Sequence, residues 1–128
     1  MNRFADARVA RLATIGAGGQ PHLVPITFAV RGNVIVTAVD HKPKRSMDLR
    51  RLRNIETNPR VSVLVDHYDD DWSLLWWVRA DGVARILRGD DRAEPLRWLA
   101  EKYDQYLTRP PEGPVIRIDV SAWRSWSA

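Results

Sequence analysis

Basic side chains are concentrated between positions 41 and 53, and this stretch has the clearest chemical meaning in the sequence. Only Asp48 opposes its six cationic residues, Lys42, Lys44, Arg45, Arg50, Arg51 and Arg53. The whole protein has a formal net charge of +4, so the segment holds more excess charge than the chain does. Such a cluster costs self-repulsion, which a bound anion would relieve. The alternative is a solvated basic helix face.

The elements around this cluster favour a phosphate site. The residues before it alternate like a strand and those after it have helical spacing, so the cluster lies where a strand runs into a helix N-terminus. Unpaired backbone N–H groups and the helix dipole favour an anion at such a point. A sequence pI near 10.0 also indicates an anionic partner, whether nucleic acid, a phosphorylated cofactor or an acidic metabolite.

Length and composition indicate one domain spanning residues 1–128, with enough apolar residues for a real core. The absence of cysteine excludes disulfides, thiolate metal sites and a cysteine nucleophile. No apolar run is long enough to cross a bilayer, and the N-terminus lacks the apolar core of a signal peptide. We therefore expect a cytoplasmic protein without a membrane partner.

The apolar periodicity predicts two helices and six or seven strands, because residues 72–87 are long enough for one bent strand or two. The expected strands are 8–15, 21–30, 34–39, 60–66, 72–87 with a bend near 80–82, and 115–120; the expected helices are 43–57 and 91–107. Gly16 to Gln20 is a hairpin signal, and Pro25 implies a sheet edge or a bulge. Short antiparallel strands joined by tight turns favour a β-barrel with helices at its ends or corners. Residues 121–128 are expected to form a tail.

Several details follow from spacing alone. Leu49, Leu52 and Ile55 form one apolar stripe on the first helix, so Lys44 and Arg51 are expected to face solvent. On the second helix, Asp91 and Glu94 are typical of a capping-box start, and the expected buried face comprises Leu96, Leu99, Tyr103 and Leu107. Trp72 and Trp76 should share one strand face and Trp77 the other, with packing or a dimer interface as their main role.

Several motifs together resemble the split β-barrel flavin-binding family of pyridoxamine-phosphate-oxidase-like proteins. They are Arg-Leu-Ala-Thr-Ile (11–15), Pro-His-Leu-Val-Pro (21–25), the basic helix ending in Asn-Pro-Arg (58–60), and Val-Ser-Val-Leu-Val-Asp (61–66). The resemblance covers roughly residues 5–88 and, more loosely, the last strand. Within the family, His-Lys-Pro-Lys-Arg (41–45) and Asp-His-Tyr-Asp-Asp-Asp-Trp (66–72) are similar to a branch that uses the deazaflavin coenzyme F420.

The resemblance implies a split antiparallel β-barrel, mainly β with flanking helices, that forms a homodimer with coenzyme at the subunit interface. Relatives hold the phosphate with a basic residue eight positions before the Asn-Pro proline, which is Arg51 here; Lys44 and Arg45 lie one or two turns earlier. The ring system in relatives lies against strand positions that match Val24, Pro25, Ile26, Thr27, Thr37, Ala38 and Val39. The coenzyme carries the hydride chemistry, so no catalytic acid or base is expected from the protein.

Other candidates near the basic helix have weaker support. Arg50 and Arg53 would reach an acidic coenzyme tail or be solvated, and Asn54 lies one turn on from Arg51. His41 would neighbour the phosphate or the ribityl chain, or be inert. Thr14, like Thr27 and Thr37, would hydrogen-bond a ring edge or be an ordinary strand residue.

Other classes of site find little support. The three histidines, His22, His41 and His67, have no metal-ligand spacing, and Asp69–Asp71 reads as a solvated acidic turn. No nucleophile elbow or dinucleotide-binding glycine motif is present.

The sequence thus predicts an F420-dependent oxidoreductase that acts on a small hydrophobic or conjugated substrate. The alternatives are an FMN flavoprotein of the same fold, a tetrapyrrole-binding member of the family, and a basic barrel that binds single-stranded nucleic acid. The nucleic-acid alternative is disfavoured because the tryptophans lie far in sequence from the basic run.

Overall fold

The computed structural model describes residues 2–39 and 45–128, with side chains described for 3–39 and 50–128. Its strands are β1 (Ala10–Ile15), β2 (Pro21–Ile26), β3 (Ala29–Arg31), β4 (Val34–Ala38), β5 (Arg60–His67), β6 (Trp76–Leu87) and β7 (Val115–Ser127). Its α-helices are α1 (Asn2–Asp6), α2 (Arg45–Thr57), α3 (Ala93–Lys102) and α4 (Gln105–Thr108). None of the helices in these ranges is long and apolar enough to span a bilayer.

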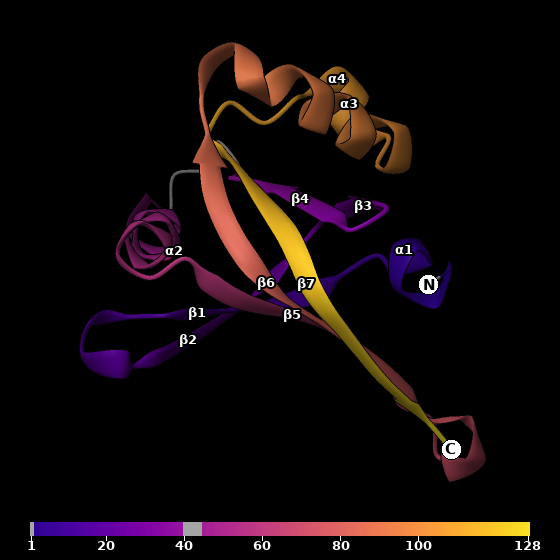
Figure 1. The fold of residues 1–128 in the computed structure, drawn as a ribbon. Coiled ribbons are helices and arrows are strands. Elements are labelled where there is room, and N and C mark those ends of the chain that lie inside the picture. The colour runs from indigo at the N-terminus through magenta and orange to yellow at the C-terminus, as the bar shows by residue number, and fades with distance from the viewer. Residues whose placement is uncertain (1, 40–44) are drawn as a thin grey trace.

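The seven strands form one curled antiparallel sheet in the order β2-β1-β5-β6-β7-β4-β3 (Figure 1). The predicted class, a mainly β split barrel with flanking helices, is confirmed. The two longest strands, β6 and β7, run side by side through the middle of the sheet. Their register shifts between Asp81 and Gly82, where the sequence predicted a bend. A Cβ at Gly82 would collide with the carbonyl oxygen of Asp119, so this close approach requires glycine.

The predicted strand 21–30 is not one strand. The chain leaves the sheet at Thr27 and Phe28, so β2 and β3 lie at opposite edges of the sheet. Pro25 lies on the edge strand β2, as its missing N–H led us to expect. Alternation alone did not reveal the break, because both halves have the same apolar period.

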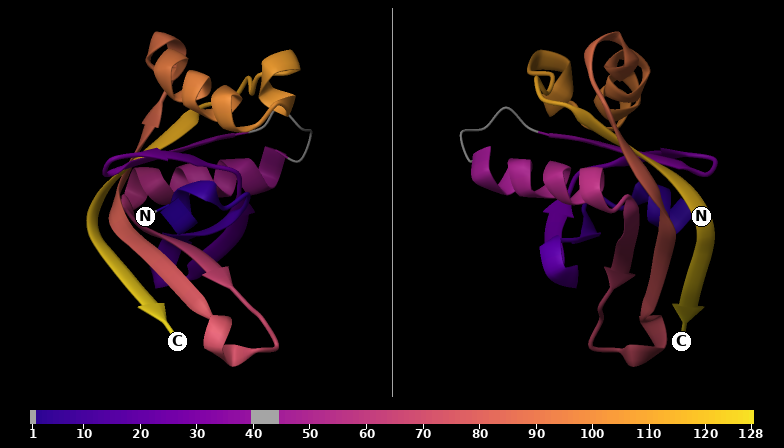
Figure 2. Two further views of the ribbon diagram at one scale, coloured as in Figure 1. Left: turned by 90° about the vertical axis from the view of Figure 1, so that its right-hand side faces the viewer. Right: turned by 60° about the vertical axis from the view of Figure 1, so that its left-hand side comes forward.

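Alternate residues of the strands point into the curled sheet and form the main core. Examples are Leu12, Val63 and Ile118, all fully enclosed. Helix α2 packs against β1 and β6, and its Leu52 and Ile55 are buried in this core as the stripe predicted. Figure 2 shows α2 beside the β1–β2 hairpin, with α3 and α4 at the other end of the sheet.

The second predicted helix is broken into two. Helix α3 begins at Ala93 without a side-chain cap, so the expected capping box at Asp91 and Glu94 is wrong. It ends at Tyr103, which adopts an extended conformation, and α4 follows separately. Leu99 and Tyr103 are buried against β3, β4 and β7, whereas Leu107 on α4 is exposed.

The expected tail is also wrong, because β7 continues to Ser127 and pairs with β6 along its length. Trp72 differs from its expected place as well. It lies in a short 3₁₀ turn, 72–74, and is exposed, so it does not share a strand face with Trp76. Asp71 caps that turn by accepting hydrogen bonds from Ser73, which explains part of the acidic loop without a metal ion.

Candidate anion-binding site

A cleft of about 540 Å³ lies between the β1–β2 hairpin and α2. The hairpin contributes Gly16, Ala17, Gln20 and His22, and the helix contributes Arg50, Arg53, Asn54 and Thr57. The elements meet here because the hairpin extends beyond the core and α2 runs beside it (Figure 2). Residues from two adjacent helical turns therefore face a glycine-rich turn.

The floor of the cleft is built by the inner face of the hairpin. Thr14 on β1 and His22 on β2 are cross-strand partners, so their side chains lie on the same face. The Asn54 Nδ2 amide donates a hydrogen bond of 3.0 Å to Thr14 Oγ1. Both residues are buried. This contact ties the helix to the hairpin and fixes the depth of the cleft.

The charge in the cleft is wholly positive. Arg50 and Arg53 are exposed to it, and no carboxylate is among its described lining residues. Burial, followed by the charges of Arg50 and Arg51, lowers the pKa of His22. The Nδ1 atom of His22 is enclosed and has no hydrogen-bond partner in the described part of the chain. The cleft therefore offers charged and neutral donors to an anion and nothing that would repel one.

Two of the residues predicted to bind a cofactor, Arg50 and Asn54, line this cleft. Arg51 is adjacent to it but is only 8% exposed, so the expectation that it faces solvent is wrong. Arg51 is buried next to Leu52, so the buried side of α2 is wider than the stripe of Leu52 and Ile55. Helical spacing predicts the stripe but does not predict burial of the adjacent arginine.

Three of the residues predicted to bind a cofactor lie outside the described backbone or the described side chains. His41 and Lys44 lie outside the described residues. Arg45 is the first residue of α2, and its side chain is outside the described set.

The remaining predicted residues lie elsewhere, and none lines the cleft. Thr37 donates a 2.7 Å hydrogen bond to the backbone oxygen of Thr27, whose hydroxyl lies 2.8 Å from the Tyr106 hydroxyl. Val39 is buried at the end of β4, and Pro25 is exposed. Thr27 and Thr37 are therefore linked to α4 through Tyr106, whereas Val39 packs in the main core.

His22, the hairpin turn and Thr57 are site residues that the sequence reasoning missed. His22 was considered only as a metal ligand. Its alternation with Val24 on β2 could have shown that it faces inward. In the described ranges no three histidine or acidic side chains come together to hold a metal ion.

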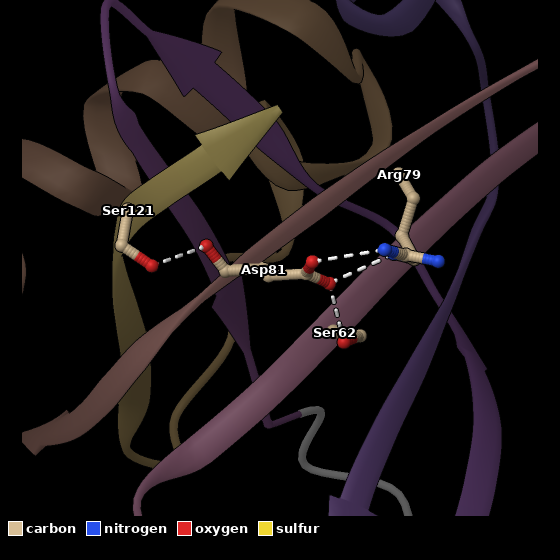
Figure 3. Close-up of polar contacts among 4 residues, drawn as sticks. All are labelled: Ser62, Arg79, Asp81 and Ser121. Carbon is tan, nitrogen blue, oxygen red and sulfur yellow. Dashed lines mark hydrogen bonds and ion pairs between the residues drawn. The ribbon is translucent and has the colours of Figure 1, made fainter. Parts of the chain in front are cut away.

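The outer face of the sheet carries a second polar group (Figure 3). The Arg79 guanidinium holds the Asp81 carboxylate through two contacts, of 2.9 and 3.1 Å. Ser62 Oγ donates to the same carboxylate at 2.7 Å, and Ser121 Oγ donates to the Asp81 backbone oxygen. The hydrogen bonds from Arg79 lower the pKa of Asp81. The group is internally paired, unlike the cleft.

The sequence profile of the pyridoxamine 5'-phosphate oxidase family matches residues 1–127. The chain belongs to this family. The resemblance deduced from the motifs is thereby confirmed over nearly the whole chain. A curated relative is the 5a,11a-dehydrotetracycline/5a,11a-dehydrooxytetracycline reductase of Streptomyces rimosus, 41% identical over 59 residues. That match covers 44% of this chain and only 38% of the reductase.

Solved structures share the fold over almost the whole chain. A conserved hypothetical protein of Mycobacterium tuberculosis is 26% identical with a TM-score of 0.76, covering 98% of this chain and 81% of its own. A protein described as an F420 reductase is 24% identical with a TM-score of 0.71, covering 96% of this chain and 94% of its own. These similarities establish the split-barrel fold of the chain.

Proposed function

We propose that this protein is an F420-dependent oxidoreductase that transfers a hydride between the deazaflavin coenzyme and a small hydrophobic or conjugated molecule. The observation that carries the proposal is the cleft where Arg50, Arg53 and His22 meet, whose described lining residues include no carboxylate. The F420 reductase of the same fold and the dehydrotetracycline reductase support the reaction class.

The residues of the cleft fit an extended anion. Arginine forks match phosphate and carboxylate oxygens, and such charge-assisted hydrogen bonds are stronger than neutral ones. Arg50 and Arg53 lie one helical turn apart, so they can contact successive anionic groups rather than one. Lys44, Arg45 and His41, which precede them in sequence, are proposed to extend the same binding surface.

The bound coenzyme would supply the hydride chemistry. The chain itself would bind the anionic part, orient the ring and exclude water. Thr37 on β4, Val39 just after it, Thr27 just after β2 and Pro25 on the edge strand are proposed to meet the ring. Thr37 is hydrogen-bonded to Thr27, and Thr27 to Tyr106, which restrains these two threonines.

FMN is the alternative coenzyme, and anionic length distinguishes the two. FMN ends at its phosphate, which would leave Arg53 without a ligand group, whereas the acidic tail of F420 reaches further. Titration of the purified protein with F420 and with FMN, followed by tryptophan quenching, tests this. We expect tighter binding of F420. Equal or reversed affinities would remove the case for a deazaflavin enzyme.

The substrate class is a separate part of the proposal. The name of the Streptomyces relative describes reduction of a double bond in a conjugated ring system. An absorbance assay of reduced F420 with conjugated polycyclic ketones should show coenzyme oxidation that depends on the protein. Absence of turnover with every conjugated acceptor, in a protein that binds F420, would restrict the proposal to coenzyme binding.

We also propose a homodimer in which the outer sheet face is the interface. Leu23 and Val83 are exposed there, and a hollow of about 460 Å³ nearby is walled by Leu64 and Trp77. Contiguous exposed apolar surface usually marks an interface. Light scattering should give twice the 14.7 kDa chain mass at micromolar concentration. A monomer mass would contradict the interface and any coenzyme site shared between subunits.

A further inference from the structure

His22 is placed where a proton can respond to the contents of the cleft. It lines the cleft from β2, opposite the α2 arginines, and its ring is partly enclosed. Its Nδ1 has no acceptor in the described part of the chain. A buried donor left without a partner is costly, so the neutral ring is favoured while no anion is present.

The groups facing His22 explain why its charge depends on occupancy. From α2, the two cations that act on it are Arg50 and Arg51, with Arg53 in the same cleft. From β1, its cross-strand partner is the neutral Thr14. From the turn, the lining residues Gly16, Ala17 and Gln20 are uncharged. Among the residues with described side chains, the charges that act on the imidazole are those of arginines, and an anion lying against them would oppose their field.

We propose that His22 takes up a proton when an anion enters this cleft and then acts as a third cationic ligand beside Arg50 and Arg53. The inference rests on the proposed function in taking the phosphate or carboxylate groups of the coenzyme as the natural anion. The inference adds His22 to the residues that bind the anion, and it predicts that anion binding is coupled to proton uptake.

The sign of the pH dependence follows from linkage. Burial, followed by the charges of Arg50 and Arg51, holds the pKa of His22 low in the empty protein, and a bound anion would raise it. Between the two pKa values the complex binds more protons than the empty protein does. Affinity therefore increases as pH falls through that window, by up to about tenfold per pH unit.

The first experiment uses sulfate, because phosphate monoesters titrate near neutral pH and would confuse the result. The Cε1–H resonance of His22 is followed by NMR against pH, in sulfate and in sodium chloride of equal ionic strength. The resonance is assigned from its loss in His22→Gln. We expect a higher His22 pKa in sulfate, with no sulfate-specific change at His67, an exposed histidine at the end of β5. An unchanged His22 pKa in sulfate overturns the inference.

The second experiment separates this inference from the proposed function. F420 binding is measured by calorimetry in buffers of different ionisation enthalpy, for the parent, His22→Gln and the control His67→Gln. Proton uptake that is lost only in His22→Gln supports the inference. F420 binding without proton uptake overturns it but leaves the function standing. A His22 pKa that responds to sulfate in a protein that does not bind F420 supports the anion site and removes the proposed coenzyme.

Discussion

Two regions of this molecule place cations against a buried surface, and they do so in opposite ways. In the cleft between α2 and the hairpin, Arg50 and Arg53 face an open volume. Beneath α3, the Lys102 ammonium is enclosed, with Nζ 3.8 Å from the centroid of the Phe28 ring and no hydrogen-bond partner in the described residues. Burial, assisted by the charge of Arg8, lowers the pKa of Lys102 to about 8, and Asp6 opposes the shift.

The contrast separates charge that serves binding from charge that serves the fold. Arg50 and Arg53 have no ion-pair partner among the residues whose side chains the structure describes, so we expect their removal to affect ligand binding more than stability. The region around Lys102 is organised by Tyr103, whose hydroxyl accepts from the Phe28 N–H and donates to the Arg8 backbone oxygen. Changes there should affect stability and not ligands.

The largest expected effect is on binding. Changing Arg50 and Arg53 together to Ala should weaken F420 or sulfate binding about a hundredfold, because each lost charge-assisted hydrogen bond is worth roughly 1.5 kcal/mol. The melting temperature should stay constant or rise slightly as repulsion is relieved. Calorimetry and thermal melts measure both quantities. The matched control is the double variant Arg88→Ala and Arg109→Ala, which removes two exposed arginines outside the cleft. A similar loss of affinity in that control would show that the cleft arginines have no specific role in binding.

Arg51 should behave differently from its neighbour. Because Arg51 is buried, Arg51→Ala should lower the free energy of unfolding by about 2 kcal/mol, through lost packing as well as lost charge. Arg50→Ala should change it by less than about 0.5 kcal/mol. Urea denaturation of the two variants provides the comparison. Equal stabilities would mean that burial of Arg51 contributes nothing to the fold.

In the second region, Tyr103→Phe should cost about 1.5 kcal/mol, because it leaves the buried Phe28 N–H without an acceptor. Tyr106→Phe is the matched control, because the Tyr106 hydroxyl contacts the less buried Thr27 hydroxyl. Its removal leaves no backbone N–H without an acceptor. We expect a smaller loss there. Chemical denaturation at pH 7 measures both, and a larger loss for Tyr106→Phe would reverse the assignment.

The smallest effect concerns Lys102. Its folded pKa lies below its unfolded value, so the unfolded chain binds more protons between about pH 8 and pH 10.5, and parent stability should rise across that window. Lys102→Met should stabilise the protein at pH 7 by about 1 kcal/mol, a modest gain because the side chain is only partly buried. The advantage should shrink toward pH 10.5. Arg97→Met, on the exposed side of the same helix, should show neither effect in pH-dependent melts.

The contrast also shows how far sequence reasoning reached. Local signals identified the hairpin at 16–20, the end of α2 before Pro59 and the alternation of 60–66, because short-range sterics and period determine them. The break at Thr27 and Phe28 was missed, since it depends on two halves of one apolar run joining different sheet edges. The extension of β7 to Ser127 was missed because only its pairing with β6 makes an exposed polar segment a strand.

The same division applies to the site. Charge density located Arg50, and the three-residue spacing from Arg51 located Asn54, without any structural information. The place of His22 in the cleft depends on the hairpin lying beside α2, a contact between residues about thirty positions apart that no periodicity predicts.

The central place of β7 has a consequence for how the chain is made. Synthesis runs from the N-terminus, and β3 and β4 reach the rest of the sheet only through β7, where Ala38 pairs with Val115. Until residues 115–127 have emerged from the ribosome, β4 and β6 both present open edges rich in apolar residues. Such edges template non-native pairing. The nascent protein should therefore depend on chaperones until this late stage, and its slowest folding step should be insertion of the last strand between two strands already in place.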